Sequence, residues 1–136
     1  MKIVLDTNVI VSGLLSPFGP PGELVRMLAS GILKLCYDAR ILSEYHTVLC
    51  RKKFRFDQAH VETLLDQIKA CGYITVCKPL SQRLPHSDDE PFLEVALGGN
   101  VQYLITGNLK HFSSGKQKTI SIVSPSEFLE IYRKIQ

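Results

Sequence analysis

The stretch YLITGN, Tyr103–Asn108, is an apolar run that stops abruptly at a small polar turn. Such a run is typical of a buried strand that leads into a loop. Similar runs recur along the chain, and they are nearly continuous rather than alternating. They are KIVL (2–5), ILKLCY (32–37), YITVC (73–77), VQYLIT (101–106) and TISIV (119–123), and the fourth of these overlaps YLITGN. Continuous apolar strands are expected where a sheet is covered on both faces, so the pattern predicts five such strands.

Segments of helical periodicity lie between these strands. Apolar residues recur three and four positions apart within 24–28, 41–49 and 61–68. After the last strand, Ser124 is placed as an N-cap, Pro125 as the first helical residue and Glu127 as the capping-box partner. Strands that alternate with helices predict an α/β fold, a three-layer α/β/α sandwich around a central five-stranded parallel sheet.

Length and composition fit one domain over residues 1–136, since 45% of the residues are hydrophobic. We expect SPFGPPG (16–22) and KPLSQRLPHS (78–87) to be loops. The four cysteines form no C-x-x-C pair, which disfavours a zinc site or a disulfide framework. MKIVLD is already a strand, which leaves no room for a signal peptide, and no run is long enough for a membrane span. We therefore expect a cytoplasmic protein that does not enter the membrane.

Parallel sheets place their sites at the carboxyl ends of strands, and three acidic residues are candidates there. Asp6 follows the first strand, although it could equally be a turn or capping residue. Glu44 lies three residues after Ile41 and four before Val48, at the edge of the apolar helix face. It could also be a first-turn Glu that favours the helix dipole and reaches water.

The third candidate lies in HSDDEPFLEVALGG (86–99), where a helix must begin just before Pro91. Asp88 is the natural N-cap, which leaves Asp89 in phase with Phe92 on the inward face, while Glu94 projects to a different side. The alternative is an acidic helix start without a further role.

Three carboxylates gathered at one end of a sheet would repel one another unless a cation lay among them. Oxygen ligands without cysteine, and without histidine at ligand spacing, favour Mg²⁺ or Mn²⁺ over zinc. Such an ion activates water and neutralises charge on a phosphodiester, so Asp6, Glu44 and Asp89 are predicted metal ligands.

These residues resemble the PIN-domain ribonucleases, particularly the branch that contains toxins of prokaryotic toxin–antitoxin pairs. The matching pieces are IVLDTNVIVSGL, ILSEYHTVL, SDDEPFLEVALGGNVQYLITGN and PSEFLEIY, which together span nearly the whole chain. The resemblance implies a PIN-like sandwich, a Mg²⁺- or Mn²⁺-dependent endoribonuclease, frequent dimerisation and an antitoxin that occludes the site. Its acidic quartet falls on Asp6, Glu44, Asp89 and Asn108.

Asn108 departs from the family pattern, which usually has an aspartate at this position. An amide can ligate a hard cation but adds no charge and accepts no proton at neutral pH, so metal affinity should fall. Asn108 could also be a helix N-cap. Asn8 and Thr106 could support the cluster by hydrogen bonds, and either Glu94 or Asp88 could shift into the site to replace the missing charge.

The segment CRKKFRF (50–56) follows the helix of Glu44 and mixes basic with aromatic residues, which suits single-stranded RNA. Its candidate RNA-binding residues are Arg51, Lys52, Lys53 and Arg55. Basic residues at a helix end also favour the helix dipole, so part of this charge has a structural explanation. A second candidate rim is Lys110, His111, Lys116 and Lys118, and the four histidines look too scattered to nominate a general base.

The function predicted is a metal-dependent endoribonuclease that cleaves single-stranded RNA, the toxin of a toxin–antitoxin pair and a homodimer. The alternative is a PIN-like module that binds RNA or a partner after Asn108 weakened catalysis. A haloacid-dehalogenase-like phosphatase is disfavoured, because its acidic pair should follow the threonine strand and here Asp88 and Asp89 precede Thr106.

Overall fold

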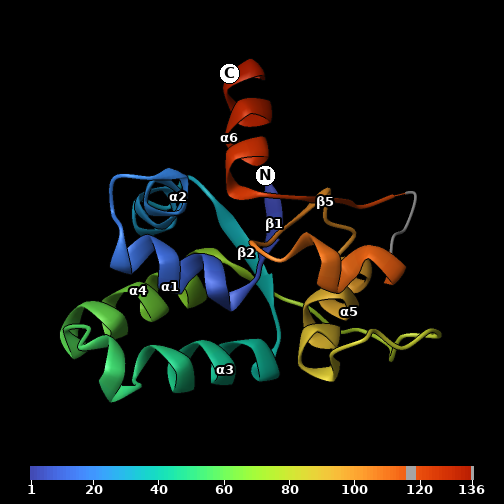
Figure 1. Ribbon diagram of the computed structural model, residues 1–136, viewed down its shortest axis with the longest axis horizontal. Helices are drawn as coiled ribbons and strands as arrows, with labels where there is room; N and C mark the ends of the chain where they lie inside the picture. The colour runs from blue at the N-terminus through green and yellow to red at the C-terminus, as the bar shows by residue number, and fades with distance from the viewer. Residues whose placement is uncertain (116–118, 136) are drawn as a thin grey trace.

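The computed structural model describes residues 1–115 and 119–135 and contains a five-stranded parallel sheet (Figure 1). The strands lie side by side in the order β3-β2-β1-β4-β5. Their bounds are β1 Lys2–Leu5, β2 Lys34–Tyr37, β3 Tyr73–Ile74, β4 Tyr103–Ile105 and β5 Ser121–Val123. The register pairs Ile3 of β1 with Leu35 on one side and with Tyr103 on the other. Lys116 and Lys118 of the second predicted rim lie outside the described residues.

Helices flank the sheet on both sides, so the predicted three-layer α/β/α sandwich is confirmed. The α-helices are α1 Thr7–Leu15, α2 Pro20–Ala29, α3 Ala39–Leu49, α4 Gln58–Cys71, α5 Glu90–Gly98 and α6 Pro125–Lys134, and the short 3-10 helices are η1 Lys52–Phe54, η2 Ser87–Asp89 and η3 Leu109–Gly115. Figure 1 shows α1, α2 and α4 on one side of the central strands and α5 on the other. No helix in the described ranges is long and apolar enough to cross a membrane.

Local sequence signals explain where two of these helices begin. At α6, Ser124 accepts a hydrogen bond from the Glu127 amide and Glu127 accepts one from the Ser124 amide, which confirms the predicted capping box. The prediction that 16–22 is entirely loop was wrong, because α2 begins at Pro20. Pro20 and Pro21 occupy the first helical turn, where a missing amide hydrogen leaves no bond unmade.

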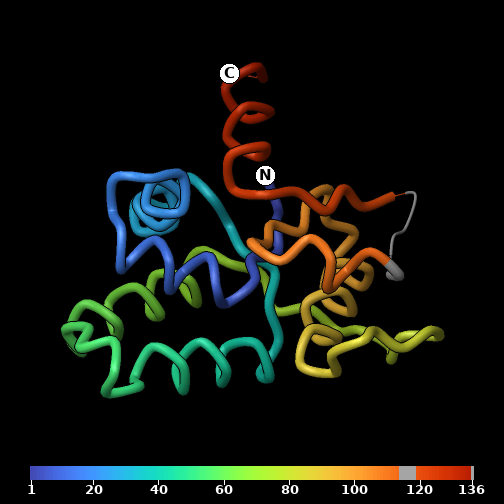
Figure 2. Tube along the Cα trace, in the orientation of Figure 1, coloured from blue at the N-terminus to red at the C-terminus, as the bar shows by residue number. Residues whose placement is uncertain are grey.

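Strand β3 differs most from its prediction. The run 73–77 was expected to be a strand covered on both faces, but only Tyr73 and Ile74 pair with β2. Ile74 is 78% exposed and Val76 is 91% exposed. The apolar residues identified a strand but did not reveal that it lies at the edge of the sheet, where the chain leaves after two residues (Figure 2).

The strand order creates a topological switch point between β1 and β4. The chain leaves β1 toward β2 and β3, whereas it leaves β4 in the opposite direction toward β5. Ile3, Leu5 and Leu104 in these two central strands are fully buried. Loops diverge from the carboxyl ends of β1 and β4, which leaves room for a site there in open α/β sheets. Asp6 and Thr106 are the residues at these two ends.

Candidate active site

Asp6 lies at the end of β1 and immediately before α1, and only 6% of its surface is exposed. Its backbone amide donates to the Ile105 carbonyl at 2.9 Å, which extends the β1–β4 ladder by one residue. It occupies the N-cap position of α1 but its side chain makes no capping hydrogen bond. Instead the Thr106 hydroxyl donates to Asp6 Oδ2 at 2.8 Å. The carboxylate therefore points across the strand ends rather than back onto its own helix.

The electrostatic environment of Asp6 shows which charges gather around it. Burial is the main cause that raises the pKa of Asp6 from its ordinary 3.8 to about 6, and the negative charges of Asp89 and Glu44 raise it further. The hydrogen bond from Thr106 acts in the opposite direction. Two carboxylates from distant parts of the sequence thus lie close enough to act on Asp6 at this strand end, as a cation site would require.

Glu44 is held near Asp6 by the neighbouring residues of α3. Asp38 caps this helix by accepting a hydrogen bond from the Ile41 amide at 3.1 Å. Tyr45 is fully buried and donates its hydroxyl hydrogen to the Leu5 carbonyl, which fixes α3 against the end of β1. Glu44 itself is half-buried and accepts a hydrogen bond from the Thr7 hydroxyl. Glu44, which was predicted at the edge of the apolar helix face, therefore has a polar partner for its half-buried carboxylate.

Asp89 is buried, with 9% of its surface exposed, at the last residue of η2. The prediction that Asp88 caps the following helix was wrong: α5 begins at Glu90, and Asp89 occupies the N-cap position without a side-chain capping bond. The reason is that η2 continues directly into α5, so the cap position moves one residue along. Asp88 is exposed, and its predicted turn toward the site is not observed.

Asp89 Oδ2 is buried and accepts no hydrogen bond from the described residues. His111 Nδ1 lies 3.0 Å from this oxygen, yet the contact lacks hydrogen-bond geometry. Burial raises the pKa of Asp89, and the charge and proximity of the His111 imidazole act in the opposite direction. A buried carboxylate oxygen that accepts no hydrogen bond is costly in a protein interior, so this atom is one that a bound cation would satisfy.

Two of the four histidines, which looked too scattered along the sequence to nominate a general base, lie together in this region. The rings of His86 and His111 lie 4.4 Å apart, centroid to centroid, at an angle of 37°. His111 comes from η3, whose first turn places it three residues after Asn108. That spacing was the one feature of the sequence that could have pointed to His111, since residues three apart face the same way in a 3-10 helix and His111 would then lie on the same side as Asn108.

Asn108 and the supporting candidates form a hydrogen-bonded turn after β4. The Asn108 amide donates to Thr106 Oγ1 at 2.9 Å, and the Gly107 amide donates to Asn8 Oδ1 at 3.4 Å. The side chain of Asn108 is exposed and makes no hydrogen bond within the described chain. Thr106 thus links Asp6 to the backbone of this turn, while Asn8 ties the turn to α1.

Glu94 was predicted to project to a different side of its helix from the inward face, and this side is covered by other residues. It is 8% exposed, and its carboxylate lies 2.6 Å from Arg40 Nη1 and accepts the Leu80 amide at 2.9 Å. Its helical phase was read from the apolar residues alone, which could not reveal that Arg40 and the 78–87 segment cover this side of α5. Glu94 is therefore a structural ion-pair residue rather than a replacement for the missing fourth acid.

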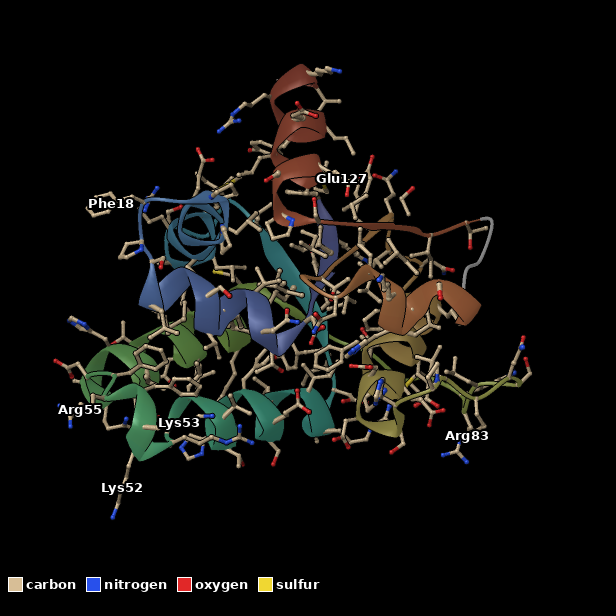
Figure 3. The ribbon with its side chains drawn as sticks, viewed as in Figure 1. Phe18, Lys52, Lys53, Arg55, Arg83 and Glu127 are labelled. Atoms are coloured by element: carbon tan, nitrogen blue, oxygen red, sulfur yellow. The ribbon has the colours of Figure 1, made fainter. Side chains whose placement is uncertain are left out.

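The basic cluster, Arg51, Lys52, Lys53 and Arg55, is exposed throughout. Figure 3 shows Lys52 and Arg55 pointing outward, on the opposite side of the molecule from Arg83. The rings of Phe54 and Phe56 stack within the segment, with centroids 5.3 Å apart. The helix α3 that carries Glu44 ends at Leu49, and Arg51 follows two residues later in an extended conformation. The basic cluster therefore lies beyond the C-terminal end of the helix that carries Glu44.

The donor set of the site fits a hard divalent cation. It consists of the carboxylates of Asp6, Glu44 and Asp89, among which the buried Oδ2 of Asp89 has no hydrogen-bond partner. Within residues 1–115 and 119–135, no three His, Cys, Asp or Glu side chains converge closely enough to enclose an ion as they stand. The carboxylates would therefore have to move closer together to enclose an ion.

The comparisons agree with the fold. The family model described as PIN domain matches residues 2–110. The crystal structure of VapBC2 from Rickettsia felis, bound to a DNA fragment from their promoter, is similar over 91% of this chain and 98% of that chain, with 17% sequence identity and a TM-score of 0.55. No curated protein matches the sequence. The family match covers most of the chain, and the chain belongs to the PIN-domain family.

Proposed function

We propose that this protein is a metal-dependent endoribonuclease that cleaves single-stranded RNA. The observation that carries the proposal is the buried carboxylate of Asp6 at the carboxyl end of β1, near the negative charges of Glu44 and of Asp89, whose buried Oδ2 has no hydrogen bond from the described residues. Carboxylates that repel one another in a buried site are typical of nuclease metal centres, because the ion compensates their charge. Membership of the PIN-domain family supports the same reaction class.

Asp6, Glu44 and Asp89 would hold the metal, which is Mg²⁺ or Mn²⁺. When bound, such an ion supplies an activated water and neutralises charge on the phosphodiester. Thr106 orients Asp6 through its hydroxyl, and Thr7 orients Glu44. Asn108 faces solvent beside this cluster, where its amide can contact the substrate or a water but adds no charge.

The RNA would extend from the carboxylates along α3 toward the basic cluster. Exposed arginines and lysines bind phosphates without sequence preference, and the stacked pair of Phe54 and Phe56 adds aromatic surface beside them. The VapBC2 structure supports two further proposals, that the chain is a toxin and that its partner is an antitoxin protein. A homodimer is also proposed, as the family resemblance implies.

A second candidate is an RNA- or partner-binding module with weakened catalysis, and the neutral Asn108 favours it. Cleavage of a labelled single-stranded RNA in Mn²⁺, Mg²⁺ or EDTA distinguishes the two. We expect cleavage that needs metal, is lost in Asp6→Ala and rises in Asn108→Asp. Activity that appears only in Asn108→Asp would assign the native protein to the binding class, and release of phosphate from a monoester would point to a phosphatase.

A further inference from the structure

We propose that His111 supplies a nitrogen ligand to the metal and that this makes the site select Mn²⁺ over Mg²⁺. The inference rests on the proposed function, because it concerns the same metal site. It differs from the sequence-based prediction in placing the fourth protein ligand at His111 rather than at Asn108.

His111 contacts Asp89 directly. Nδ1 and Oδ2 lie 3.0 Å apart, and Oδ2 accepts no hydrogen bond from any described residue. Two donors on adjacent corners of an octahedron, with bonds of about 2.1 Å, lie about 3.0 Å from each other. The two atoms are therefore spaced as neighbouring ligands of one ion would be, and an ion would satisfy the lone pairs of both.

His111 is held by a backbone hydrogen bond and by the ring of His86. Its backbone amide donates to the Asn108 carbonyl at 3.0 Å, which anchors the first turn of η3 to the end of β4. The ring of His86 packs against the His111 ring with centroids 4.4 Å apart. His86 thus restricts rotation of the imidazole, and a ligand whose orientation is fixed in advance loses less entropy on binding.

Asn108 and His111 differ in their exposure and in their contacts with the carboxylates. Asn108 is exposed, and among the described residues its side chain has no hydrogen-bond partner to hold it toward the carboxylates. His111 is 36% exposed at its side chain and touches a buried carboxylate directly. Of the two residues after β4, His111 is the better placed to replace the family's fourth acid.

An imidazole nitrogen changes which ion the site prefers. Mg²⁺ takes oxygen ligands almost exclusively, whereas first-row transition ions bind nitrogen more readily. Among those ions, Mn²⁺ is the one best suited to a site that is otherwise made of carboxylates. A set of Asp6, Glu44, Asp89 and His111 therefore favours Mn²⁺.

Pulsed electron paramagnetic resonance of Mn²⁺ bound to the full chain tests this directly, because a coordinated ¹⁴N nucleus gives a characteristic hyperfine coupling. We expect the coupling in the native protein, its loss in His111→Gln and its retention in His60→Gln, a control at an exposed histidine of α4. Calorimetry should show Mn²⁺ affinity falling at least about tenfold in His111→Gln while Mg²⁺ affinity changes less than about twofold.

Two results would overturn the inference. Mn²⁺ that binds the native protein through oxygen alone, or equal losses of Mn²⁺ and Mg²⁺ affinity in His111→Gln, would leave His111 as a residue that only positions Asp89. In that case Asp6-dependent metal binding and RNA cleavage would remain, and the proposed function would stand. Absence of any Mn²⁺ binding that Asp6→Asn removes would overturn both proposals.

Discussion

Thr106 donates its hydroxyl hydrogen to Asp6 across 2.8 Å, although the two residues are 100 positions apart in the sequence. The bond joins the ends of β4 and β1, the strands on either side of the topological switch point. Thr106 also accepts the Asn108 amide, so one hydroxyl group orients the central carboxylate and shapes the turn beside it. The site thus depends on strand pairing in the sheet as well as on its acidic residues.

Stability should fall as pH rises in the protein without metal. The pKa of Asp6 is about 6 in the folded chain and near 3.8 when unfolded, so the native state holds the extra proton between these values. This proton stabilises the folded state by on the order of 3 kcal/mol. The stabilisation is fully present below pH 4 and is lost as the pH rises through 6. Asp6→Asn should remove this loss and stabilise the metal-free protein at pH 7.5.

Urea unfolding in EDTA at pH 4.5 and 7.5 measures this effect. Asp66→Asn is the matched control, because Asp66 is an exposed carboxylate whose side chain is 72% accessible. We expect the control to follow the native pH dependence and Asp6→Asn to depart from it. Identical curves for Asp6→Asn and the native protein would show that the Asp6 carboxylate is not destabilised by its surroundings.

Replacing Thr106 distinguishes the effect of its hydroxyl group from the effect of its size. Thr106 is fully buried, so Thr106→Val keeps the shape but removes the hydrogen bond to Asp6 and leaves the Asn108 amide without its acceptor. We expect a loss of about 1–3 kcal/mol in the free energy of unfolding. Because Thr106 lowers the pKa of Asp6, the pH midpoint of Mn²⁺ binding should move upward.

Calorimetric Mn²⁺ titrations between pH 5 and 8 measure this midpoint. Thr106→Ser retains the hydroxyl and should behave more like the native protein than Thr106→Val does. If the two variants shifted the midpoint equally, the change would arise from packing and not from the hydrogen bond to Asp6.

Glu94 should matter far more for stability than a comparable surface acid. Its buried carboxylate binds both Arg40 and the Leu80 amide, so Glu94→Ala leaves that amide unsatisfied and releases the 78–87 segment from α5. We expect a loss of about 1–3 kcal/mol in urea unfolding. Glu23→Ala removes an ion pair with Arg133 at a similar distance, 2.7 Å, but on an exposed surface, and should cost less than about 1 kcal/mol.

Limited proteolysis gives a second readout for Glu94. Cleavage after Arg83, which is exposed at the outer part of this segment, should accelerate in Glu94→Ala and stay unchanged in Glu23→Ala (Figure 3). Equal stability and equal cleavage in the two variants would contradict the structural role of Glu94.

Patterns within single elements explain what could be predicted from the sequence. Asp6 was placed correctly at a strand end because KIVL is a short apolar run, and the Ser124 capping box lies within four residues. Contacts between elements could not be predicted in this way. The proximity of His111 to Asp89 depends on how η3 packs against η2, and the exposure of Ile74 depends on which strand lies at the edge. Asp89 was recognised as inward-facing, but its neighbours were not.

The basic cluster lies beyond the C-terminal end of α3 and contains none of the proposed metal ligands. Four Gln replacements at Arg51, Lys52, Lys53 and Arg55 should weaken RNA binding without changing Mn²⁺ affinity. Each phosphate that the variant no longer binds should reduce the slope of log affinity against log salt by about 0.7 for a single strand. Filter binding of a labelled RNA at several salt concentrations, in EDTA to prevent cleavage, measures both the affinity and the slope. Lys134→Gln, at an exposed lysine in the last turn of α6, is the control for net charge. If the control reduced the slope per charge as much as the quadruple variant, the RNA would be attracted by overall charge, and the path along α3 would be wrong.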